Sequence, residues 1–246
     1  MTVRLLLRTL ARRGLISLAY PLLRPLVDAL LTADSRNIER WRQRRALEET
    51  GRFVEECMPR VPSHRCAAEL LRHAVRAAQE SGGEGDGLVC EFGVYRGATL
   101  NRIARLLPRA TVWGFDSFAG LPEDWRDRFP RGTYAVKGLP RTRPNVRLVK
   151  GLYHETLGPF LLEQPGKARF LHIDCDLYSS TQTVLQAFAA RIVPGTVLLF
   201  DEFFNYPGWQ EGEYRAFAEW LERDAVRVEY LGYCRYAEQV AVQVVG

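Results

Sequence analysis

Two short acidic segments hold the side chains best suited to chemistry. Asp174 and Asp176 follow one apolar run of the chain, and Asp201 and Glu202 follow the next. If the two runs are neighbouring strands, these carboxylates converge, and two charges roughly 4 Å apart repel by about 4 kcal/mol at an effective dielectric near 20. A hard divalent cation would offset that repulsion, and all-oxygen ligation favours magnesium, calcium or manganese over zinc. A protonated carboxyl or an interposed basic group is the alternative.

The predicted strand 88–91 runs into a glycine turn, and its last residue is unusual for such a turn. A dinucleotide-binding loop starts on glycine, because backbone amides must approach a pyrophosphate closely. Here Glu91 takes that position, ahead of Gly93 and Gly97, and a carboxylate repels phosphate. A cofactor with a cationic end and no phosphate fits better, and S-adenosylmethionine, with ammonium and sulfonium groups, meets that description. The residue disfavours the alternative, a dinucleotide-dependent oxidoreductase.

Asp116 ends the next predicted strand, 23 residues after Gly93. This is close to the spacing at which an acid accepts hydrogen bonds from a ribose diol. The glycines let the backbone turn tightly, and the helix that starts near Ala98 directs its amides toward the ligand. We therefore favour cofactor binding over the alternative that Glu91 and Asp116 only cap nearby helices.

The predicted metal ligands are Asp174, Asp201 and Glu202, with Asp176 as a helix-end or substrate contact. A divalent cation lowers the pKa of bound water from about 15.7 to about 7. It would lower the pKa of a coordinated substrate hydroxyl in the same way, so that the hydroxyl oxygen could take the methyl group of S-adenosylmethionine at neutral pH. Asp174 would lie nearest the sulfonium, hold the metal and take the proton, and is the predicted catalytic residue. His154 is either a base or a loop residue beside the adenine.

The segment 205–214 follows the predicted metal ligands and combines aromatic, amide and acidic side chains. We interpret it as a loop that binds a small hydroxyl-bearing acceptor. Trp209 and Tyr214 could equally belong to the core of the following helix.

Apolar periodicity places these residues on an alternating α/β chain. It predicts strands over 88–91, 111–115, 146–150, 169–173 and 196–200, with helices over 98–107, 156–162, 181–190 and 211–223. Such alternation indicates a doubly wound parallel sheet with helices on both faces. Two final strands, 226–231 and 239–245, have no helix between them and should be antiparallel. Loops at the carboxyl ends of the strands then build the ligand site.

The length of 246 residues fits one catalytic domain with an extension. The glycine-rich segment 81–87 precedes the first strong strand and is the predicted boundary. Residues 1–80 would form an N-terminal helical extension, with helices over 37–57 and 63–80, and residues 81–246 the Rossmann-like domain.

The positive charge of the chain, +5 overall, is concentrated at its N-terminus. Residues 1–50 hold ten arginines and five acids, while the rest is balanced, so a nucleic-acid partner is not expected. A basic amphipathic helix is predicted over 1–31; it would contact an anionic membrane surface or, as we favour, pack on the domain or a second subunit.

The five cysteines are widely spaced, without a C-x-x-C pair, which is typical of reduced thiols. The apolar run 15–31 is interrupted by prolines and charged residues, so it predicts no membrane span. Without a secretory signal, a cytoplasmic location is expected.

Four motifs in order resemble the macrocin O-methyltransferase family of class I S-adenosylmethionine-dependent methyltransferases. They are EFGVYRG at 91–97, DSFAGLP at 116–122, DCDLYSST at 174–181 and DEF at 201–203. The resemblance covers residues 88–245, and Asp201-Glu202 stands where well-known members carry two aspartates. It implies a seven-stranded sheet with a reversed last strand, a magnesium ion and a sugar-type hydroxyl acceptor. Residues and resemblance together predict cofactor contacts at Glu91, Gly93, Val94, Gly97, Thr99, Asp116, Ser117 and Asp174.

Two further alternatives stay open from the sequence. One is a methyltransferase that works without a metal. The other is a non-catalytic protein that keeps the fold and uses its N-terminal helix to reach a membrane or a protein partner.

Overall fold

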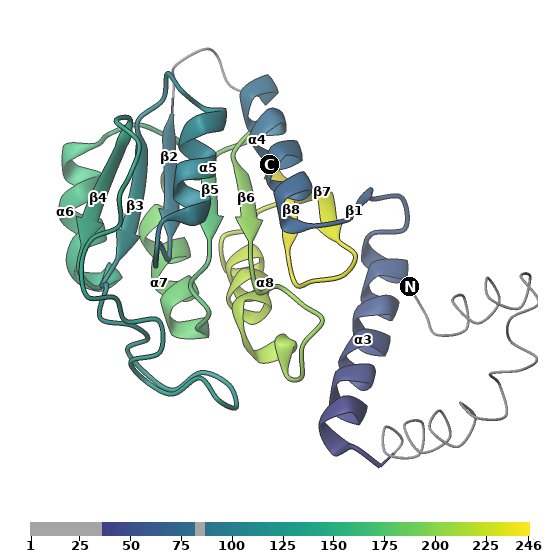
Figure 1. The fold of residues 1–246 in the computed structure, drawn as a ribbon. Helices are drawn as coiled ribbons and strands as arrows, with labels where there is room; N and C mark the ends of the chain where they lie inside the picture. Colours follow the sequence, from purple (N-terminus) through teal and green to yellow (C-terminus); the bar gives the residue numbers. More distant parts are fainter. Residues whose placement is uncertain (1–35, 82–86) are drawn as a thin grey trace, which may run out of the picture.

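The computed structural model describes residues 36–81 and 87–246. Its strands are β1 (Ser63–His64), β2 (Leu88–Phe92), β3 (Val112–Asp116), β4 (Val146–Lys150), β5 (Ala168–Ile173), β6 (Val197–Phe200), β7 (Val228–Cys234) and β8 (Val240–Val244). They form one eight-stranded sheet in the order β1-β7-β8-β6-β5-β2-β3-β4 (Figure 1).

The strand directions confirm the predicted doubly wound sheet. Strands β2 to β6 pair in parallel, whereas β8 runs antiparallel to both β6 and β7. The eighth strand, β1, was not predicted. Its two residues fall where a helix was expected to begin, because the carbonyls of Pro62 and His64 accept hydrogen bonds from the amides of Tyr233 in β7 and Arg235 directly after it. That helix, α4, therefore starts at Ala67.

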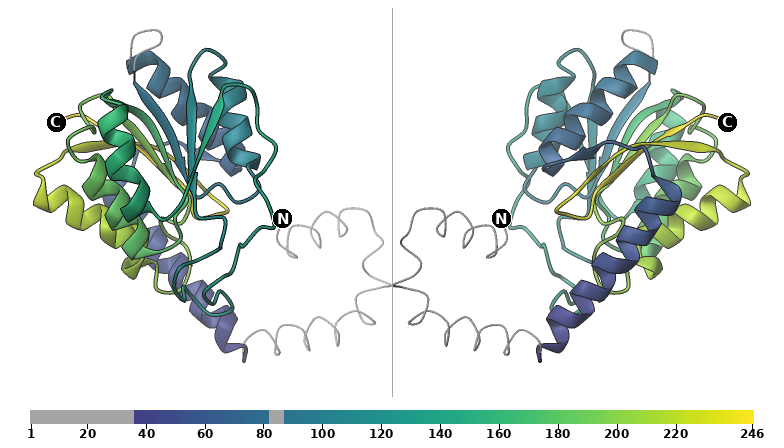
Figure 2. Two further views of the ribbon diagram at one scale, coloured as in Figure 1. Left: turned by 90° about the vertical axis from the view of Figure 1, so that its left-hand side faces the viewer. Right: turned by 90° about the vertical axis from the view of Figure 1, so that its right-hand side faces the viewer.

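Helices cover both faces of the sheet, as Figure 2 shows. The helices are α3 (Ile38–Cys57), α4 (Ala67–Ser81), α5 (Ala98–Leu106), α6 (Tyr153–Glu163), α7 (Tyr178–Phe188), the short 3-10 turn η1 (Trp209–Glu211) and α8 (Glu213–Arg223). One apolar core lies between the sheet and α4 and α5, and another between the sheet and α6, α7 and α8. Because side chains alternate along a strand, neighbouring residues of β2 such as Val89 and Cys90 enter opposite cores.

Helix α3 lies beside the sheet (Figure 1) and supports the chain that follows β6. Asn37 caps it by accepting a hydrogen bond from the Arg40 amide at 3.2 Å. Gln43 donates to the carbonyl of Asn205 at 2.6 Å, and the hydroxyl of Thr50 accepts from the Asn205 amide at 2.9 Å. This confirms the helix predicted over 37–57.

The predicted helix over 1–31 lies outside the described residues, as does most of the glycine-rich segment 81–87. Helix α4 buries Leu70, Leu71 and Ala74 against the sheet and shares its core. The division between residues 80 and 81 stays a prediction. Within residues 36–81 and 87–246, no helix has both the length and the apolar character needed to cross a membrane.

Candidate active site

A cavity of about 470 Å³ opens at the carboxyl ends of the central strands. Its walls come from the segments after five strands, which is where ligand sites of open α/β sheets form. They include Gly93 after β2, Asp116 and Ser117 at β3, His154 after β4, Asp174 and Asp176 after β5, and Asp201 and Glu202 after β6. The sheet thus brings the acids at the carboxyl ends of β3, β5 and β6 together in one cavity.

Gly93 allows the turn after β2 to pass against the end of β5. Its φ is +99°, and a Cβ atom there would lie 1.7 Å from the carbonyl oxygen of Asp174. The two segments are joined where the Asp174 amide donates to the Phe92 carbonyl at 2.9 Å. A side chain at position 93 would therefore force apart the segments that carry the acidic residues.

Asp116 fastens the same turn from the next strand. Its Oδ2 accepts hydrogen bonds from the amides of Val94 at 2.9 Å and Tyr95 at 2.7 Å, and its Oδ1 accepts from Phe118 at 2.6 Å. This backbone role corresponds to the capping alternative considered for Asp116. The residue also lines the cavity, so ribose binding by a remaining lone pair stays a prediction.

Glu91 does not line the cavity. It is 1% exposed and lies within β2, where its Oε1 is 3.0 Å from Nδ1 of His172 on the neighbouring β5. Nε2 of His172 lies 3.7 Å from Oδ1 of Asp201 at the end of β6. Buried Glu91 and His172 thus form a row with Asp201, whose partly exposed side chain lines the cavity.

The central imidazole of this row favours its charged form. Burial opposes the charge, but hydrogen bonding to Asp201 and Glu91 raises the pKa of His172 well above its ordinary value. Although burial alone would raise the pKa of Asp201, its contact with His172 lowers it. Neither Glu91 nor His172 lines the cavity, and the direct contact of Glu91 with the cationic cofactor stays a prediction.

Of the other predicted cofactor contacts, Gly93, Ser117 and Asp174 line the cavity with Asp116, whereas Val94, Gly97 and Thr99 do not. Val94 is 4% exposed and packs with the α4 and α5 core. Gly97, with φ of +75°, forms the N-cap of α5. Val94 and Gly97 belong to the turn between β2 and α5, whereas Thr99 lies in the first turn of α5. Direct contact of these three residues with a cofactor stays a prediction.

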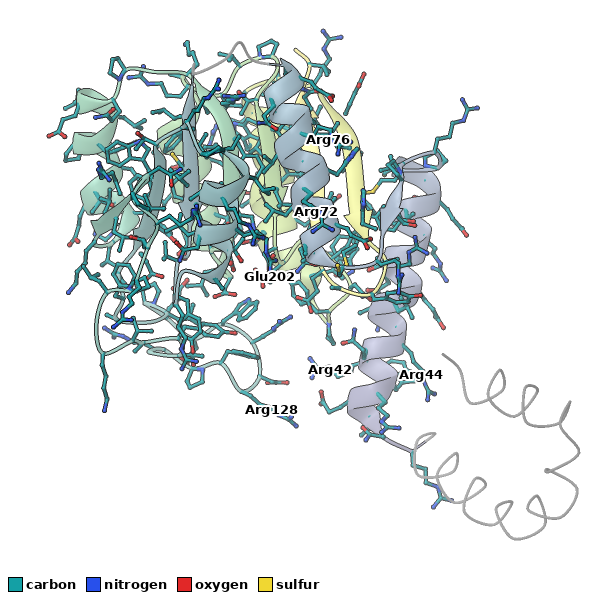
Figure 3. All side chains as sticks on the ribbon, turned by 45° about the horizontal axis from the view of Figure 1, so that its top comes forward. Arg42, Arg44, Arg72, Arg76, Arg128 and Glu202 are labelled. Carbon is teal, nitrogen blue, oxygen red and sulfur yellow. The ribbon has the colours of Figure 1, made fainter. Side chains whose placement is uncertain are left out.

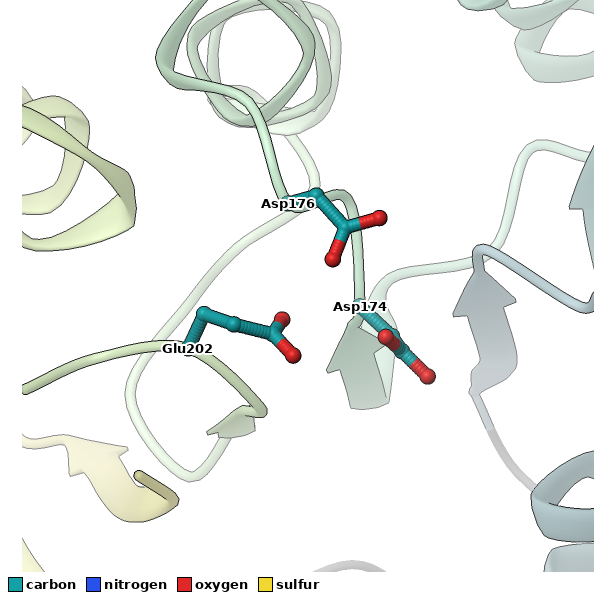
Figure 4. A group of neighbouring side chains, drawn as sticks. All are labelled: Asp174, Asp176 and Glu202. Atoms are coloured by element: carbon teal, nitrogen blue, oxygen red, sulfur yellow. The ribbon is translucent and has the colours of Figure 1, made fainter. Parts of the chain in front are cut away.

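Asp174, Asp176 and Glu202 form an acidic group whose spacing could hold a metal ion. One carboxylate oxygen of each lies within 4.8 Å of the others, and all three side chains point into the same space (Figure 4). Asp176 thus takes the place in this group that the sequence assigned to Asp201, which is paired with His172 instead.

A tight turn explains the position of Asp176. The Leu177 amide donates to the Cys175 carbonyl at 2.6 Å, and Asp176 between them has φ of +62°. This is the geometry of a γ-turn, which is rare and strained for a residue with a side chain. It folds the chain back, so that the two aspartates of the D-C-D motif face the same space.

The three carboxylates resist ionisation together. Burial, followed by the charge of Asp201, raises the pKa values of Asp174 and Glu202 well above their ordinary range. Burial raises the pKa of Asp176 to about 7. Oε2 of Glu202 is also buried without a hydrogen-bond partner among the described residues. An all-oxygen group of this kind fits a hard divalent cation, which would satisfy the orphaned oxygen and relieve the repulsion.

The cavity walls carry carboxylates and no arginine or lysine among the residues described. Figure 3 shows arginines at the periphery, on α3, on α4 and on the loop at Arg128, with Glu202 between them. Such a cavity favours a cationic or neutral ligand over a phosphate-bearing one. His154 lines the wall after β4 with its side chain 69% exposed. Its role as base or adenine neighbour stays open.

The segment 205–214 does not line the cavity. Trp209 packs edge-on against Tyr214 with ring centroids 4.9 Å apart, and both contact Phe53 of α3. The alternative assignment of these two aromatic rings to the core is confirmed, and the role of the segment as an acceptor loop stays a prediction.

The structure adds wall residues that sequence reasoning missed. Tyr134 and Glu123 come from the long segment between β3 and β4, which has no periodic pattern to indicate its fold. The Ser179 hydroxyl donates to Oε1 of Glu123 at 2.6 Å and ties this segment to α7. Residues after β3 therefore enclose one side of the cavity.

Comparison with known proteins supports the methyltransferase architecture. Residues 90–203 match a family described as a methyltransferase domain. A relative from Streptomyces olivaceus, 8-demethyl-8-(2,3-dimethoxy-alpha-L-rhamnosyl)-tetracenomycin-C 4'-O-methyltransferase, is 28% identical over 159 residues, which cover 54% of this chain and 58% of that protein. The match therefore spans somewhat more than half of the curated relative.

Solved structures share the fold. CalS11, a calicheamicin methyltransferase, aligns with a TM-score of 0.60 and 24% identity over 72% of this chain and 77% of its own. The O-methyltransferase NovP aligns with a TM-score of 0.56 and 22% identity over 73% of this chain and 79% of its own. The predicted class I methyltransferase fold is confirmed.

Proposed function

We propose that this chain, in which residues 90–203 match a methyltransferase-domain family, transfers the methyl group of S-adenosylmethionine to a hydroxyl of a sugar-like or natural-product acceptor. The observation that carries the proposal is the acid-walled cavity at the carboxyl edge of a methyltransferase sheet. Its charge suits the ammonium and sulfonium groups of the cofactor. The finer assignment to the macrocin O-methyltransferase family belongs to the same proposal and rests on the four motifs.

Two parts of the cavity would contact different parts of the cofactor. Asp116 and Ser117 lie at the tip of β3, where a ribose diol would find a carboxylate acceptor. Asp174 lies at the tip of β5, near the acidic group to which the acceptor hydroxyl must come. The task of the protein is then to align oxygen, methyl carbon and sulfur, and fixed residues at strand ends suit it.

Magnesium would be held by Asp174, Asp176 and Glu202, with Asp201 directed toward His172. When bound, such a cation lowers the pKa of a coordinated hydroxyl. Asp174 is the proposed catalytic residue, because its carboxylate lines the cavity within the acidic group and can accept the hydroxyl proton. The rival, metal-free mechanism would use the same carboxylates with one of them protonated.

Metal removal separates these two mechanisms. We expect protein stripped with EDTA to lose at least about 100-fold of its methyl transfer rate, and magnesium to restore it, because three mutually repelling acids then lack their counter-cation. Calorimetric titration with magnesium in the presence of S-adenosylhomocysteine should show a binding heat. Undiminished transfer by stripped protein, with no binding heat, would establish the metal-free mechanism.

The acceptor class is tested with glycosides. The curated relative is named for a rhamnosyl tetracenomycin, so the first acceptor panel should hold rhamnosylated polyketides beside the corresponding free sugars and aglycones. We expect a singly methylated glycoside by mass spectrometry, released together with S-adenosylhomocysteine. Methylation of the aglycone alone would contradict a sugar hydroxyl as the acceptor. A cytoplasmic location, a homo-oligomer and a membrane contact through residues 1–31 stay predictions.

A further inference from the structure

Glu213 is a buried acid that the proposed reaction does not yet use. It is the first residue of α8 and is 0% exposed. An acid in the first turn of a helix ordinarily stays near solvent and interacts with the helix's own amides. Glu213 instead reaches into the segments that follow β5 and β6.

The Glu213 carboxylate joins the two segments that carry the acidic group. Its Oε1 accepts a hydrogen bond from the Cys175 amide at 3.0 Å, and its Oε2 accepts one from the Glu202 amide at 3.2 Å. Cys175 stands between Asp174 and Asp176, and Glu202 is the third acid of the group. One side chain thus holds the backbone at all three carboxylates.

The location of Glu213 is unfavourable for a group that only stabilises the fold. Its carboxylate is fully buried and lies against the backbone of the acidic group. Burying a carboxylate beside like charges costs more than a well-packed apolar side chain would. What an apolar residue cannot do is accept hydrogen bonds from two separate loops at once. The geometry therefore favours a role in fixing the distance between those loops.

We propose that Glu213 is a positioning residue whose hydrogen bonds from the Cys175 and Glu202 amides set the spacing of Asp174, Asp176 and Glu202 for a divalent cation. The inference rests on the proposed metal-assisted function. Glu213 does not line the cavity, so its effect would pass through the backbone at Cys175 and Glu202.

The test measures manganese binding directly, by the loss of the free Mn²⁺ signal in electron paramagnetic resonance of the full-length protein. Glu213→Gln keeps the shape of the side chain, but its NH2 group cannot accept a hydrogen bond from a backbone amide, so one of the two amides loses its acceptor. Glu213→Asp keeps the charge, but its shorter side chain cannot reach both amides. We expect each variant to bind Mn²⁺ about 10- to 100-fold more weakly than wild type, as second-layer changes around a metal do. Binding of S-adenosylhomocysteine, measured by calorimetry, should be unchanged.

A matched control removes a carboxylate from the other end of the same helix. Glu222 is exposed on α8, and Glu222→Gln should bind Mn²⁺ as the wild type does. Thermal unfolding of all variants shows whether each is folded.

Wild-type Mn²⁺ affinity in Glu213→Gln would overturn the proposal, even if that variant were less stable. Wild-type affinity in Glu213→Asp alone would also overturn it, because charge and not positioning would then explain the loss. If the wild type itself binds no Mn²⁺, the metal-assisted part of the proposed function fails first, and this inference falls with it.

Discussion

Replacing Asp174 with alanine should lower the rate of methyl transfer by about 1,000-fold or more, while S-adenosylhomocysteine still binds. The carboxylate has two proposed tasks, holding the cation and accepting the hydroxyl proton, and general base catalysis alone is worth roughly 10²- to 10⁴-fold. The backbone of Asp174 keeps its hydrogen bond to the Phe92 carbonyl in the variant, so the turn at Gly93 should persist.

The thermal stability of Asp174→Ala provides a second test of the role of this residue. Burial and the charge of Asp201 raise the pKa of Asp174 well above its ordinary value, so the ionised side chain opposes folding at neutral pH. Removing it in the absence of metal should leave the unfolding temperature unchanged or raise it. Loss of activity with retained stability separates a catalytic role from a structural one.

Single-turnover transfer followed by mass spectrometry, calorimetry with S-adenosylhomocysteine and a thermal melt measure these quantities. Asp224→Ala, at the exposed end of α8, serves as the control and should behave as wild type in all three. Full transfer activity in Asp174→Ala would remove the catalytic role assigned to this residue.

Gly93→Ala should destabilise the protein by more than about 4 kcal/mol, a loss few single substitutions cause. The added Cβ would lie 1.7 Å from the Asp174 carbonyl oxygen, and the φ of +99° disfavours any side chain. The backbone cannot yield without breaking the contact between the ends of β2 and β5. The variant should either fail to fold or lose cofactor binding.

Gly51→Ala is the matched control. Gly51 lies inside α3 with nothing within 4 Å of an added Cβ, so alanine there should stabilise the protein by about 0.5–1 kcal/mol. Urea unfolding measures both changes. If Gly93→Ala unfolds like the wild type and binds S-adenosylhomocysteine equally well, the close approach at this turn is not required.

The main features of the fold could be predicted because local patterns specify them. Apolar strands alternate with amphipathic helices from residue 88 onward, and the lack of a helix between β7 and β8 indicated their antiparallel pairing. Strand β1 could not be predicted, because two residues carry no periodic pattern and their pairing with β7 depends on a distant segment.

The site was predictable only where it depends on strand ends. Asp174 and Glu202 follow from the rule that parallel strands present their carboxyl ends together. The exchange of Asp201 for Asp176 depends on two features that the sequence does not reveal. One is the left-handed backbone of Asp176, and the other is the neighbouring position of β2, β5 and β6, which places His172 between Glu91 and Asp201.

Glu213 shows a further limit of sequence reasoning. An acid at the start of a helix is ordinarily a helix-stabilising charge, so its type and place indicated nothing unusual. Only the packing of α8 brings its carboxylate to the amides of Cys175 and Glu202.

The decisive experiment is a crystal structure of the protein with S-adenosylhomocysteine and Mn²⁺. We expect the nucleoside beside Asp116, the sulfur facing Asp174, and an anomalous manganese peak bound by Asp174, Asp176 and Glu202. A cavity that stays empty at saturating ligand, or a nucleoside bound elsewhere on the molecule, would contradict this expectation.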